Sequence, residues 1–268
     1  MVAVKAQLAS NLKVHPKELV QSPLWWAEQK LDGQRYIVSV TNGQVKAFNR
    51  GGVEMTIPEC IAQDFSDGTF AKGQWMFDGE LINKAYYIFD LLRAVEDLTE
   101  FPLATRHLKL EQVFDLWCPE HCHLVPTAKT EQEKANLVVS VVENRAEGIV
   151  FKQHASCYVG GKRVTSVVKM KFVDTADCVI MELYREGKPQ AVTIGAYDAT
   201  GTLTEVSGLK VPENSGLAVG DVVEVRYLYT STSNKLTQPV FVRKRTDKTA
   251  EECLLTQLRY TSKKLVGF

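Results

Sequence analysis

The stretch Leu24–Val40, LWWAEQKLDGQRYIVSV, carries one lysine at the end of an apolar, aromatic run. Lys30 is followed at fixed offsets by Asp32, Gly33 and Arg35. This pattern predicts a strand that delivers an amine to the edge of a pocket and then turns at the glycine, between a carboxylate and a guanidinium. Such an arrangement suits a phosphate-reactive site, so Lys30 is our candidate nucleophile.

The chemistry of a lysine nucleophile sets further requirements. A lysine amine is protonated at neutral pH and attacks only where burial or neighbouring cations lower its pKa. Trp25 and Trp26 make the surroundings of Lys30 apolar, and Lys169 and Lys171 alternate along one predicted strand, which places two cations on one face. A lysine that attacks phosphorus forms a phosphoramidate, that is, a nucleotidyl enzyme. Taken alone, Lys30 is more typical of an ordinary exposed lysine at a strand end than of a nucleophile.

Three further segments supply groups that this chemistry needs. Residues 77–81 repeat the combination of carboxylate and glycine at a strand end. Residues 86–91 form an aromatic cluster that can stack a base, and residues 147–152 place a carboxylate and a lysine at the two ends of one strand. Each segment is weak evidence by itself, but their order along the chain is informative.

Length and composition bound the class of protein. The 268 residues, 45% of them hydrophobic, allow two domains with real cores. The net charge of zero does not point to a polyanionic partner, but residues 148–268 hold 17 Lys and Arg against 12 Asp and Glu. Most of this excess lies in residues 145–175 and 226–248. It fits a phosphate-backbone footprint and fits a solvated charged face equally well.

The six cysteines are scattered, which predicts reduced thiols. The segment Trp117–His123, WCPEHCH, has no matching second cysteine pair, so we expect incidental thiols rather than a zinc site. No signal peptide and no run of about 18 apolar residues is found. We therefore expect a cytoplasmic monomer, of a bacterial or virus-infected cell, with no membrane contact and no obligatory protein partner.

The periodicity predicts an α+β domain over residues 1–172 and a small all-β barrel over residues 173–268. Residues 1–23 are expected to form a lead-in with a short helical turn between Pro16 and Pro23. Helices are predicted from Pro58 to Phe65, from Leu103 to Trp117, and from the capping box at Thr130 to about Asn144. Strands are predicted over residues 24–29, 35–40, 44–49, 74–82, 85–92, 147–152 and 165–172, and in the barrel over 178–184, 191–197, 202–206, 222–229 and 239–244.

The order of these segments resembles the covalent nucleotidyltransferase superfamily, which contains DNA ligases, RNA ligases and mRNA capping enzymes. Lys-x-Asp-Gly-x-Arg, Asp-Gly-Glu, the aromatic strand, Glu-Gly-x-Val-x-Lys and Lys-x-Lys are similar to its motifs I, III, IIIa, IV and V. Residues 49–51 resemble motif Ia and residues 241–248, FVRKRTDK, resemble motif VI. Residues 102–106, PLATR, are similar to the segment after motif IIIa in ATP-dependent DNA ligases. The resemblance implies a nucleotidyltransferase (adenylation) domain of antiparallel sheets with flanking helices, followed by an OB-fold.

The resemblance also implies an ATP site. Lys30 would attack the α-phosphorus of ATP, expel pyrophosphate and leave lysyl-AMP. The metal, Mg²⁺ or a substituting Mn²⁺, would be held by Asp32 and Glu147. The implied nucleotide contacts are Glu28 to the adenine amino group, Phe89 as the base stack, Arg35 and Glu80 to the ribose, Lys152 to the cofactor, and Lys169 and Lys171 to the α-phosphate.

Contacts to nicked duplex DNA are implied in the same way. Motif VI, with Arg245, Asp247 and Lys248, would orient the leaving pyrophosphate only when the second domain closes over the first. The connection over residues 185–190 is a short turn, whereas viral minimal ligases that encircle DNA carry a long latch, and we expect no N-terminal DNA-binding domain. The implied DNA contacts are Arg50 to the nicked strand, with Lys162, Arg163, Arg259, Lys263 and Lys264 as duplex contacts.

Alternatives remain within and outside the enzyme class: an RNA ligase, a capping-type nucleotidyltransferase, or a non-catalytic OB-type nucleic-acid-binding protein. A motif IV that begins with Glu-Gly favours a DNA ligase, because capping enzymes usually begin this motif with Asp-Gly. The retained Lys30 favours an active enzyme. The sequence therefore predicts an ATP-dependent DNA ligase that seals 3′-OH/5′-phosphate nicks through lysyl-AMP and a DNA adenylate.

Overall fold

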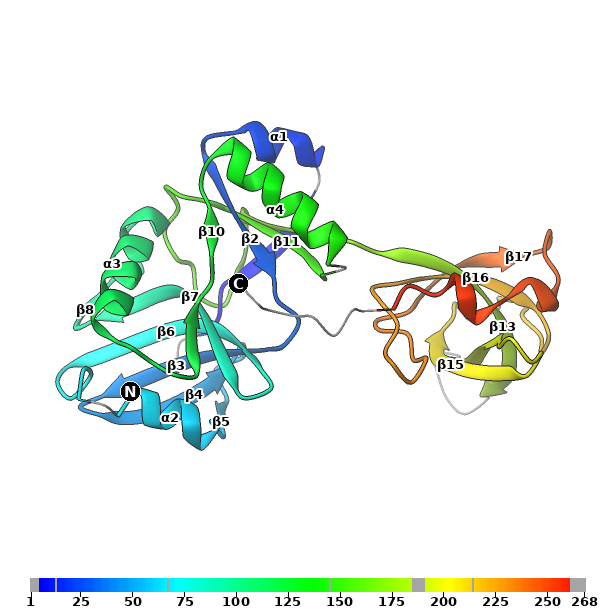
Figure 1. Ribbon diagram of the computed structural model, residues 1–268, viewed down its shortest axis with the longest axis horizontal. Helices are drawn as coiled ribbons and strands as arrows, with labels where there is room; N and C mark the ends of the chain where they lie inside the picture. The colour runs from blue at the N-terminus through cyan, green and yellow to red at the C-terminus, as the bar shows by residue number, and fades with distance from the viewer. Residues whose placement is uncertain are drawn as a thin grey trace. The chain divides into compact units, whose positions relative to one another are not determined.

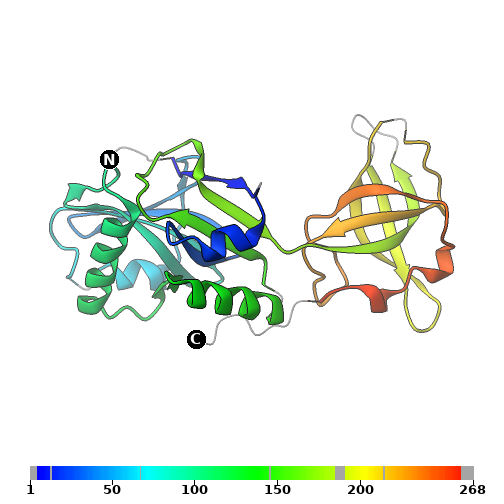
Figure 2. The same ribbon diagram turned by 90° about the horizontal axis from the view of Figure 1, so that it is seen from above.

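The computed structural model describes residues 5–12, 14–66, 68–144, 146–184, 191–213 and 215–260. Two compact units are present, one formed by Met1–Val141 and Gly148–Met170 and the other by Val142–Glu147 and Lys171–Phe268 (Figures 1 and 2). The predicted DNA contacts Lys263 and Lys264 and the predicted turn over residues 185–190 lie outside the described residues.

The larger sheet of the first unit has the strand order β5-β4-β3-β6-β7-β8, with β9 beside β7. The turn between β3 and β4 has Asn42 and Gly43 at φ values of 49° and 77°, as the Asn-Gly hairpin signal predicts. Its strands are β3 (Gln34–Thr41), β4 (Gln44–Asn49), β5 (Glu54–Met55), β6 (Gln74–Ile82), β7 (Ala85–Ala94), β8 (Glu96–Asp97) and β9 (Cys122–Leu124).

The second sheet of this unit carries Lys30 and has the order β1-β12-β11-β2-β10. Strand β11 pairs antiparallel with β2, so that Gly148 lies opposite Lys30 and Val150 lies opposite Glu28. Because side chains alternate along a strand, Glu28 and Lys30 point to the same face. Its strands are β1 (Leu8–Asn11), β2 (Trp25–Lys30), β10 (Thr127–Ala128), β11 (Gly148–Gln153) and β12 (Arg163–Lys171).

Strand β1 corrects the expectation that residues 1–23 are only a lead-in. It pairs parallel with β12, more than 150 residues away, with Leu8 opposite Arg163 and Asn11 opposite Lys169. A four-residue edge strand has too little alternation to be recognised in the sequence. The predicted helical turn within the same segment does form, as α1 (Pro16–Gln21).

Among the described residues, four α-helices accompany the sheets, and α4 begins as its capping box predicts. The Thr130 hydroxyl accepts from the Glu133 N–H at 3.2 Å, and the Glu133 carboxylate accepts from the Thr130 N–H at 2.8 Å. The helices are α1, α2 (Glu59–Asp64), α3 (Leu103–Leu116) and α4 (Glu131–Glu143).

A buried lysine of α4 holds the start of β2. The Lys134 ammonium donates to the carbonyl oxygens of Leu19, Ser22 and Trp25 at 3.1, 2.6 and 2.9 Å. Burial lowers the pKa of this lysine. Its three hydrogen bonds fix the connection from α1 into β2, the strand that ends at Lys30.

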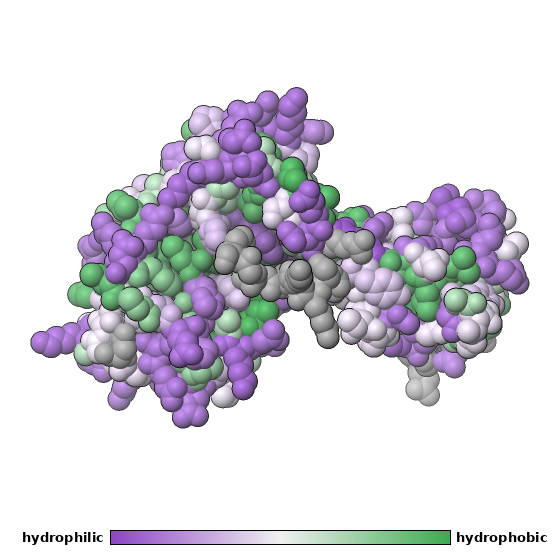
Figure 3. Space-filling view, in the orientation of Figure 1, coloured by the Kyte–Doolittle hydropathy of each residue, from purple (hydrophilic) through white to green (hydrophobic). Residues whose placement is uncertain are grey.

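The exposed edge of the large sheet is hydrophilic. Figure 3 shows predominantly hydrophilic side chains where β4, β5 and α2 lie. An ion pair of 3.1 Å between Lys46 and Glu54 joins β4 to β5 on this surface. Charged side chains at a sheet edge oppose pairing with another chain. Among the described residues, no helix is long and apolar enough to cross a membrane.

The second unit contains a five-stranded antiparallel sheet with the order β15-β14-β13-β16-β17. The side chains of Ala176, Cys178 and Ile180 enter its apolar core. Strand β15 runs to Lys210, four residues beyond the predicted end. The elements are β13 (Asp174–Tyr184), β14 (Ala191–Tyr197), β15 (Leu203–Lys210), β16 (Val222–Tyr227), β17 (Val240–Arg245) and the 3₁₀ helices η1 (Ala250–Glu252) and η2 (Leu255–Gln257).

Candidate active site

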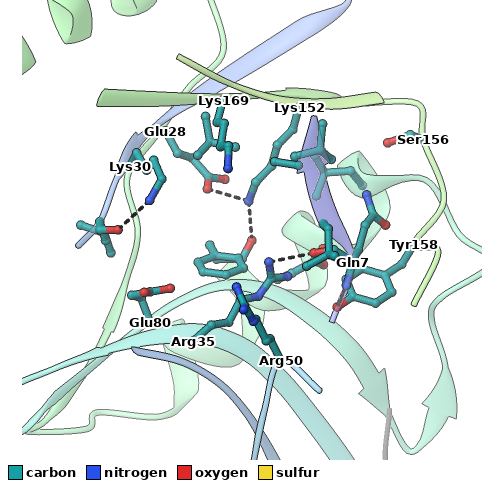
Figure 4. Close-up of a pocket in the computed structure, with 18 of the residues that line it drawn as sticks. Gln7, Glu28, Lys30, Arg35, Arg50, Glu80, Lys152, Ser156, Tyr158 and Lys169 are labelled. Atoms are coloured by element: carbon teal, nitrogen blue, oxygen red, sulfur yellow. Dashed lines mark hydrogen bonds and ion pairs between the residues drawn. The ribbon is translucent and has the colours of Figure 1, made fainter. Parts of the chain in front are cut away.

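A cavity of about 260 Å³ lies in the first unit and is lined by residues of both of its sheets. Figure 4 shows that the labelled side chains converge on this space from opposite sides. The cavity therefore gathers groups from stretches that are far apart in the sequence. The residues predicted for the site that line it are Glu28, Lys30, Arg35, Arg50, Glu80, Phe89, Lys152, Arg163 and Lys169.

Lys30 and Glu80 form one side of the cavity (Figure 4). The Lys30 amine donates to the Leu31 carbonyl oxygen at 3.4 Å, and the Gly33 N–H donates to Glu80. Gly33 permits this close approach, because a side chain there would collide with the Leu81 carbonyl oxygen. The glycine of the Lys-x-Asp-Gly pattern is thus required by the proximity of β6.

The Glu28–Lys152 ion pair and the Phe89 ring form another side of the cavity. The Glu28 carboxylate accepts from the Lys152 ammonium at 2.6 Å and from the Thr127 hydroxyl at 3.2 Å. The Lys152 nitrogen lies 4.5 Å from the centroid of the Phe89 ring. Glu28 is buried, and burial raises its pKa. A flat apolar face beside a buried hydrogen-bonding pair is suited to a planar, polar-edged ligand such as a nucleobase.

Arg35 is held by a buried carboxylate that the sequence did not single out. Its Nε and Nη2 donate to Asp78 at 2.8 and 2.6 Å, and its Nη1 donates to the Gln7 carbonyl oxygen at 2.8 Å. The Tyr158 hydroxyl donates to Asp78 at 2.7 Å. The Cζ atom of Arg35 lies 5.1 Å from the centroid of the Phe89 ring. The predicted ribose contact of Arg35 remains a prediction.

A second buried ion pair ties α3 to β7 at the cavity wall. The Nε and Nη2 atoms of Arg106 donate to the two oxygens of Asp90, both at 2.8 Å. Nη1 of Arg106 also donates to the Phe101 carbonyl oxygen at 2.6 Å. Asp90 and Arg106 both line the cavity.

Sequence reasoning missed several cavity residues for different reasons. Asp78 and Asp90 lie inside recognised motifs, where their pairing with arginines was not considered. Arg106 lies in the PLATR segment, which is similar to a segment of ATP-dependent DNA ligases, but the sequence alone predicted no role for this arginine. Gln7 and Tyr158 had no signal in residue spacing, because their position depends on the pairing of β1 with β12.

Other predicted site residues lie outside this cavity. Asp32 and Lys162 are exposed residues of the first unit. Glu147 and Lys171 belong to the second unit and form an ion pair of 2.8 Å. Arg245 and Lys248 also belong to the second unit. Among the described residues, no group of three or more His, Cys, Asp and Glu side chains is arranged to hold a metal ion.

We predict a pH effect from Glu80. Burial raises its pKa to about 7, against the opposing charges of Lys30 and Arg35. Since an unfolded glutamate titrates near 4.5, this group stabilises the fold fully below that pH, and the contribution is lost as the pH rises through about 7. Glu80→Gln should therefore reduce the fall in unfolding free energy between about pH 4.5 and about pH 8.

Urea denaturation at the two pH values measures this difference. Glu54→Gln is the matched control, because the Glu54 side chain is exposed in its pair with Lys46. An unchanged pH dependence in Glu80→Gln would contradict the assignment of this titration to Glu80.

Sequence comparisons point to one family. Residues 82–171 match the ATP dependent DNA ligase domain. A probable DNA ligase of Streptomyces griseus subsp. griseus is 27% identical over 217 residues, which cover 65% of this chain and 42% of that protein. The chain thus spans less than half the length of this curated relative.

Solved structures share the fold across nearly the whole chain. A mycobacterial DNA ligase D complexed with ATP and MES has a TM-score of 0.56 and 20% identity, and the match covers 94% of this chain and 98% of that chain. A structure from work on DNA binding with a minimal scaffold in Lig E DNA ligases has a TM-score of 0.67 and 16% identity, and covers 91% and 100%. At these identities the likeness shows the fold alone.

The fold confirms the predicted class, an α+β nucleotidyltransferase unit followed by an all-β unit of the OB type. The family match of residues 82–171 includes β7, β11 and β12, which supply Phe89, Lys152 and Lys169 to the cavity. By these matches, residues 82–171 resemble the ATP dependent DNA ligase domain, and the chain is similar in sequence to a probable DNA ligase and in fold to solved DNA ligase structures.

Proposed function

We propose that this protein is an ATP-dependent DNA ligase that seals nicks with a 3′-hydroxyl and a 5′-phosphate in duplex DNA. The observation that carries the proposal is the cavity of the first unit. It places Lys30 together with the Glu28–Lys152 pair, the Phe89 ring and the cation of Lys169. These groups come from separate motifs and supply a nucleophile, a base site and a phosphate-binding charge.

The first step is attack of the deprotonated Lys30 amine on the α-phosphorus of ATP. A nitrogen–phosphorus bond forms, the bond to the pyrophosphate oxygen breaks, and the amine proton passes to solvent. Phe89 supplies a stacking face for the base, and Glu28 accepts from the adenine amino group. Lys169 stabilises charge on the α-phosphate, which is the main electrostatic task of phosphoryl and nucleotidyl transfer.

Asp32 and Glu147 would hold a divalent cation, as the resemblance to nucleotidyltransferases implies. Asp32 and Glu147 carry carboxylate oxygens, the ligands that Mg²⁺ prefers, and Mg²⁺ commonly uses one or two carboxylates together with phosphate oxygens and water. When bound, the ion neutralises developing charge on the phosphates.

Two further steps complete sealing. The 5′-phosphate of the nick attacks lysyl-AMP, which transfers AMP to DNA and frees the Lys30 amine. The 3′-hydroxyl then attacks the 5′-phosphorus, and AMP leaves. Arg50 and Arg163, two cations of the cavity wall, would hold DNA phosphates during these steps.

The two predicted domains divide this work in our proposal. Residues 1–172 carry the chemistry of AMP transfer, and residues 173–268 contribute the OB-type unit with Arg245 and Lys248. These two cations orient the leaving pyrophosphate in the first step. The fold shared with DNA ligases supports this division.

A nick-sealing assay tests the proposal. The protein with ATP and Mg²⁺ should join the two pieces of a nicked strand in a DNA duplex, and should join the same nick within RNA at least about tenfold more slowly. A preference for the RNA nick would assign the protein to the RNA ligases instead. ATP, GTP and NAD should be supplied in parallel, and activity with GTP alone would favour a capping-type enzyme.

A further inference from the structure

Asp177 of β13 is a buried carboxylate shared by two cations of the motif VI-like segment. Its Oδ1 accepts from Arg245 Nη1 at 2.9 Å, and its Oδ2 accepts from Lys248 Nζ at 2.6 Å. Strand alternation explains its direction, because Ala176 and Cys178 on either side of it enter the core of the unit. One carboxylate thus fixes the distance between the two cationic groups.

The backbone of Asp177 is held from η2. The Gln257 carboxamide oxygen accepts from the Asp177 N–H at 2.9 Å, and its amide nitrogen donates to the Asp177 carbonyl oxygen at 2.8 Å. This side chain therefore pairs with the backbone of β13 as a neighbouring strand would. These two contacts hold the backbone of Asp177 in place at the point from which its side chain reaches Arg245 and Lys248.

Arg245 has a second carboxylate partner of a different kind. Its Nε and Nη2 donate to the two oxygens of Asp247, both at 2.8 Å. The Asp247 side chain is 63% exposed, whereas that of Asp177 is 10% exposed. A solvated anion exchanges with other anions at low cost, while a buried one is fixed. Displacement of Asp247 leaves two cations on one carboxylate, with a net charge of +1.

We propose, on the basis of the ligase function argued above, that Asp177 is a positioning residue that aligns Arg245 and Lys248 as one clamp for the pyrophosphate end of ATP. A phosphate group accepts the same two parallel N–H bonds from a guanidinium that a carboxylate accepts. The side of Arg245 that faces Asp247 is therefore the side that receives phosphate oxygens, and Asp177 holds the opposite side in place.

Asp177→Asn tests this role. Asparagine keeps the size of the side chain, but it has no charge and a single carbonyl oxygen for the two cations. The ATP concentration for half-maximal self-adenylylation should rise about 10- to 100-fold, and the pyrophosphate concentration that reverses adenylylation should rise in parallel. Sealing of a nick that already carries AMP should stay within about twofold of the wild type, because no pyrophosphate takes part in that step.

Asp221→Asn is the matched control. Asp221 accepts from Lys244, the residue before Arg245 on β17, in an ion pair of 2.6 Å. This variant loses an ion pair to the same strand but leaves Arg245 and Lys248 untouched. Its requirement for ATP and pyrophosphate should match that of the wild type.

Gln257→Met keeps every charge and removes only the support of the Asp177 backbone. It should raise the ATP requirement in the same direction as Asp177→Asn and by a smaller factor. If thermal unfolding shows that Asp177→Asn does not fold, the ATP requirement of Gln257→Met tests the inference instead.

The outcomes separate the inference from the function on which it rests. If the wild type forms an AMP adduct and both variants adenylylate as the wild type does, the inference is overturned and the ligase function stands. Equal losses in adenylylation and in sealing of the AMP-carrying nick also overturn it, because they indicate general structural damage. If the wild type forms no AMP adduct, the proposed function itself fails, and the inference with it.

Discussion

Lys30→Met is expected to reduce the sealing of an ordinary nick by about four orders of magnitude or more, because it removes the amine that forms the covalent bond to AMP in the first step. Methionine has nearly the length of lysine and removes only the amine. The same variant should still seal a nick that already carries AMP, since that step needs no lysyl-AMP. Time courses with the two nicked substrates, run in parallel, measure the contrast.

Lys46→Met is the matched control for this substitution. Lys46 lies on β4 in an exposed ion pair with Glu54 and does not line the cavity. It should seal both substrates at rates close to those of the wild type. Retained sealing of the ordinary nick by Lys30→Met would contradict the role of Lys30 as nucleophile.

Arg106→Met is expected to destabilise the first unit by about 3 to 5 kcal/mol, because it leaves Asp90 as a buried charge without its partner. The side chains of Arg106 and Asp90 are 3% and 7% exposed, and the pair joins α3 to β7 through two hydrogen bonds of 2.8 Å. All four tryptophans, Trp25, Trp26, Trp75 and Trp117, belong to the first unit. Urea denaturation followed by tryptophan fluorescence therefore reports on this unit.

The control for Arg106 is a solvent-exposed arginine–aspartate pair of the same unit. Arg93 and Asp97 form an ion pair of 2.7 Å, and their side chains are 29% and 50% exposed. Arg93→Met should change the free energy of unfolding by at most about 1 kcal/mol. Asp90→Leu combined with Arg106→Met should recover part of the loss, since it removes the uncompensated charge. Equal losses of unfolding free energy in Arg93→Met and Arg106→Met would show that burial of the ion pair does not determine the destabilisation.

The sequence alone was sufficient where local pattern and chemistry agree. The Asn42-Gly43 turn, the strand that ends at Lys30 and the capping box of Thr130 were predicted, because each depends on neighbours a few residues away. The order of the motifs then predicted that Lys30, Glu28 and their partners would share one site, and the cavity brings most of them together.

Contacts between distant segments were beyond such reasoning. The pairing of β1 with β12, which brings Gln7 to the cavity, depends on two segments with no pattern in common. Asp78 occupies the Nε and Nη2 atoms of Arg35, and nothing in the spacing of the two residues predicts that register. The same holds for Asp177. Its hydrogen bonds with Arg245 and Lys248 form only when β13 and the segment at the end of β17 are folded together.

The most direct measurement is to locate the AMP on the protein. The chain is incubated with ATP labelled at the α-phosphate and Mg²⁺, and the modified peptide is identified by mass spectrometry. We predict one AMP per chain, attached through a phosphoramidate to Lys30, and removed when pyrophosphate is added. AMP on another residue, or labelling that persists in Lys30→Met, would contradict the proposed mechanism.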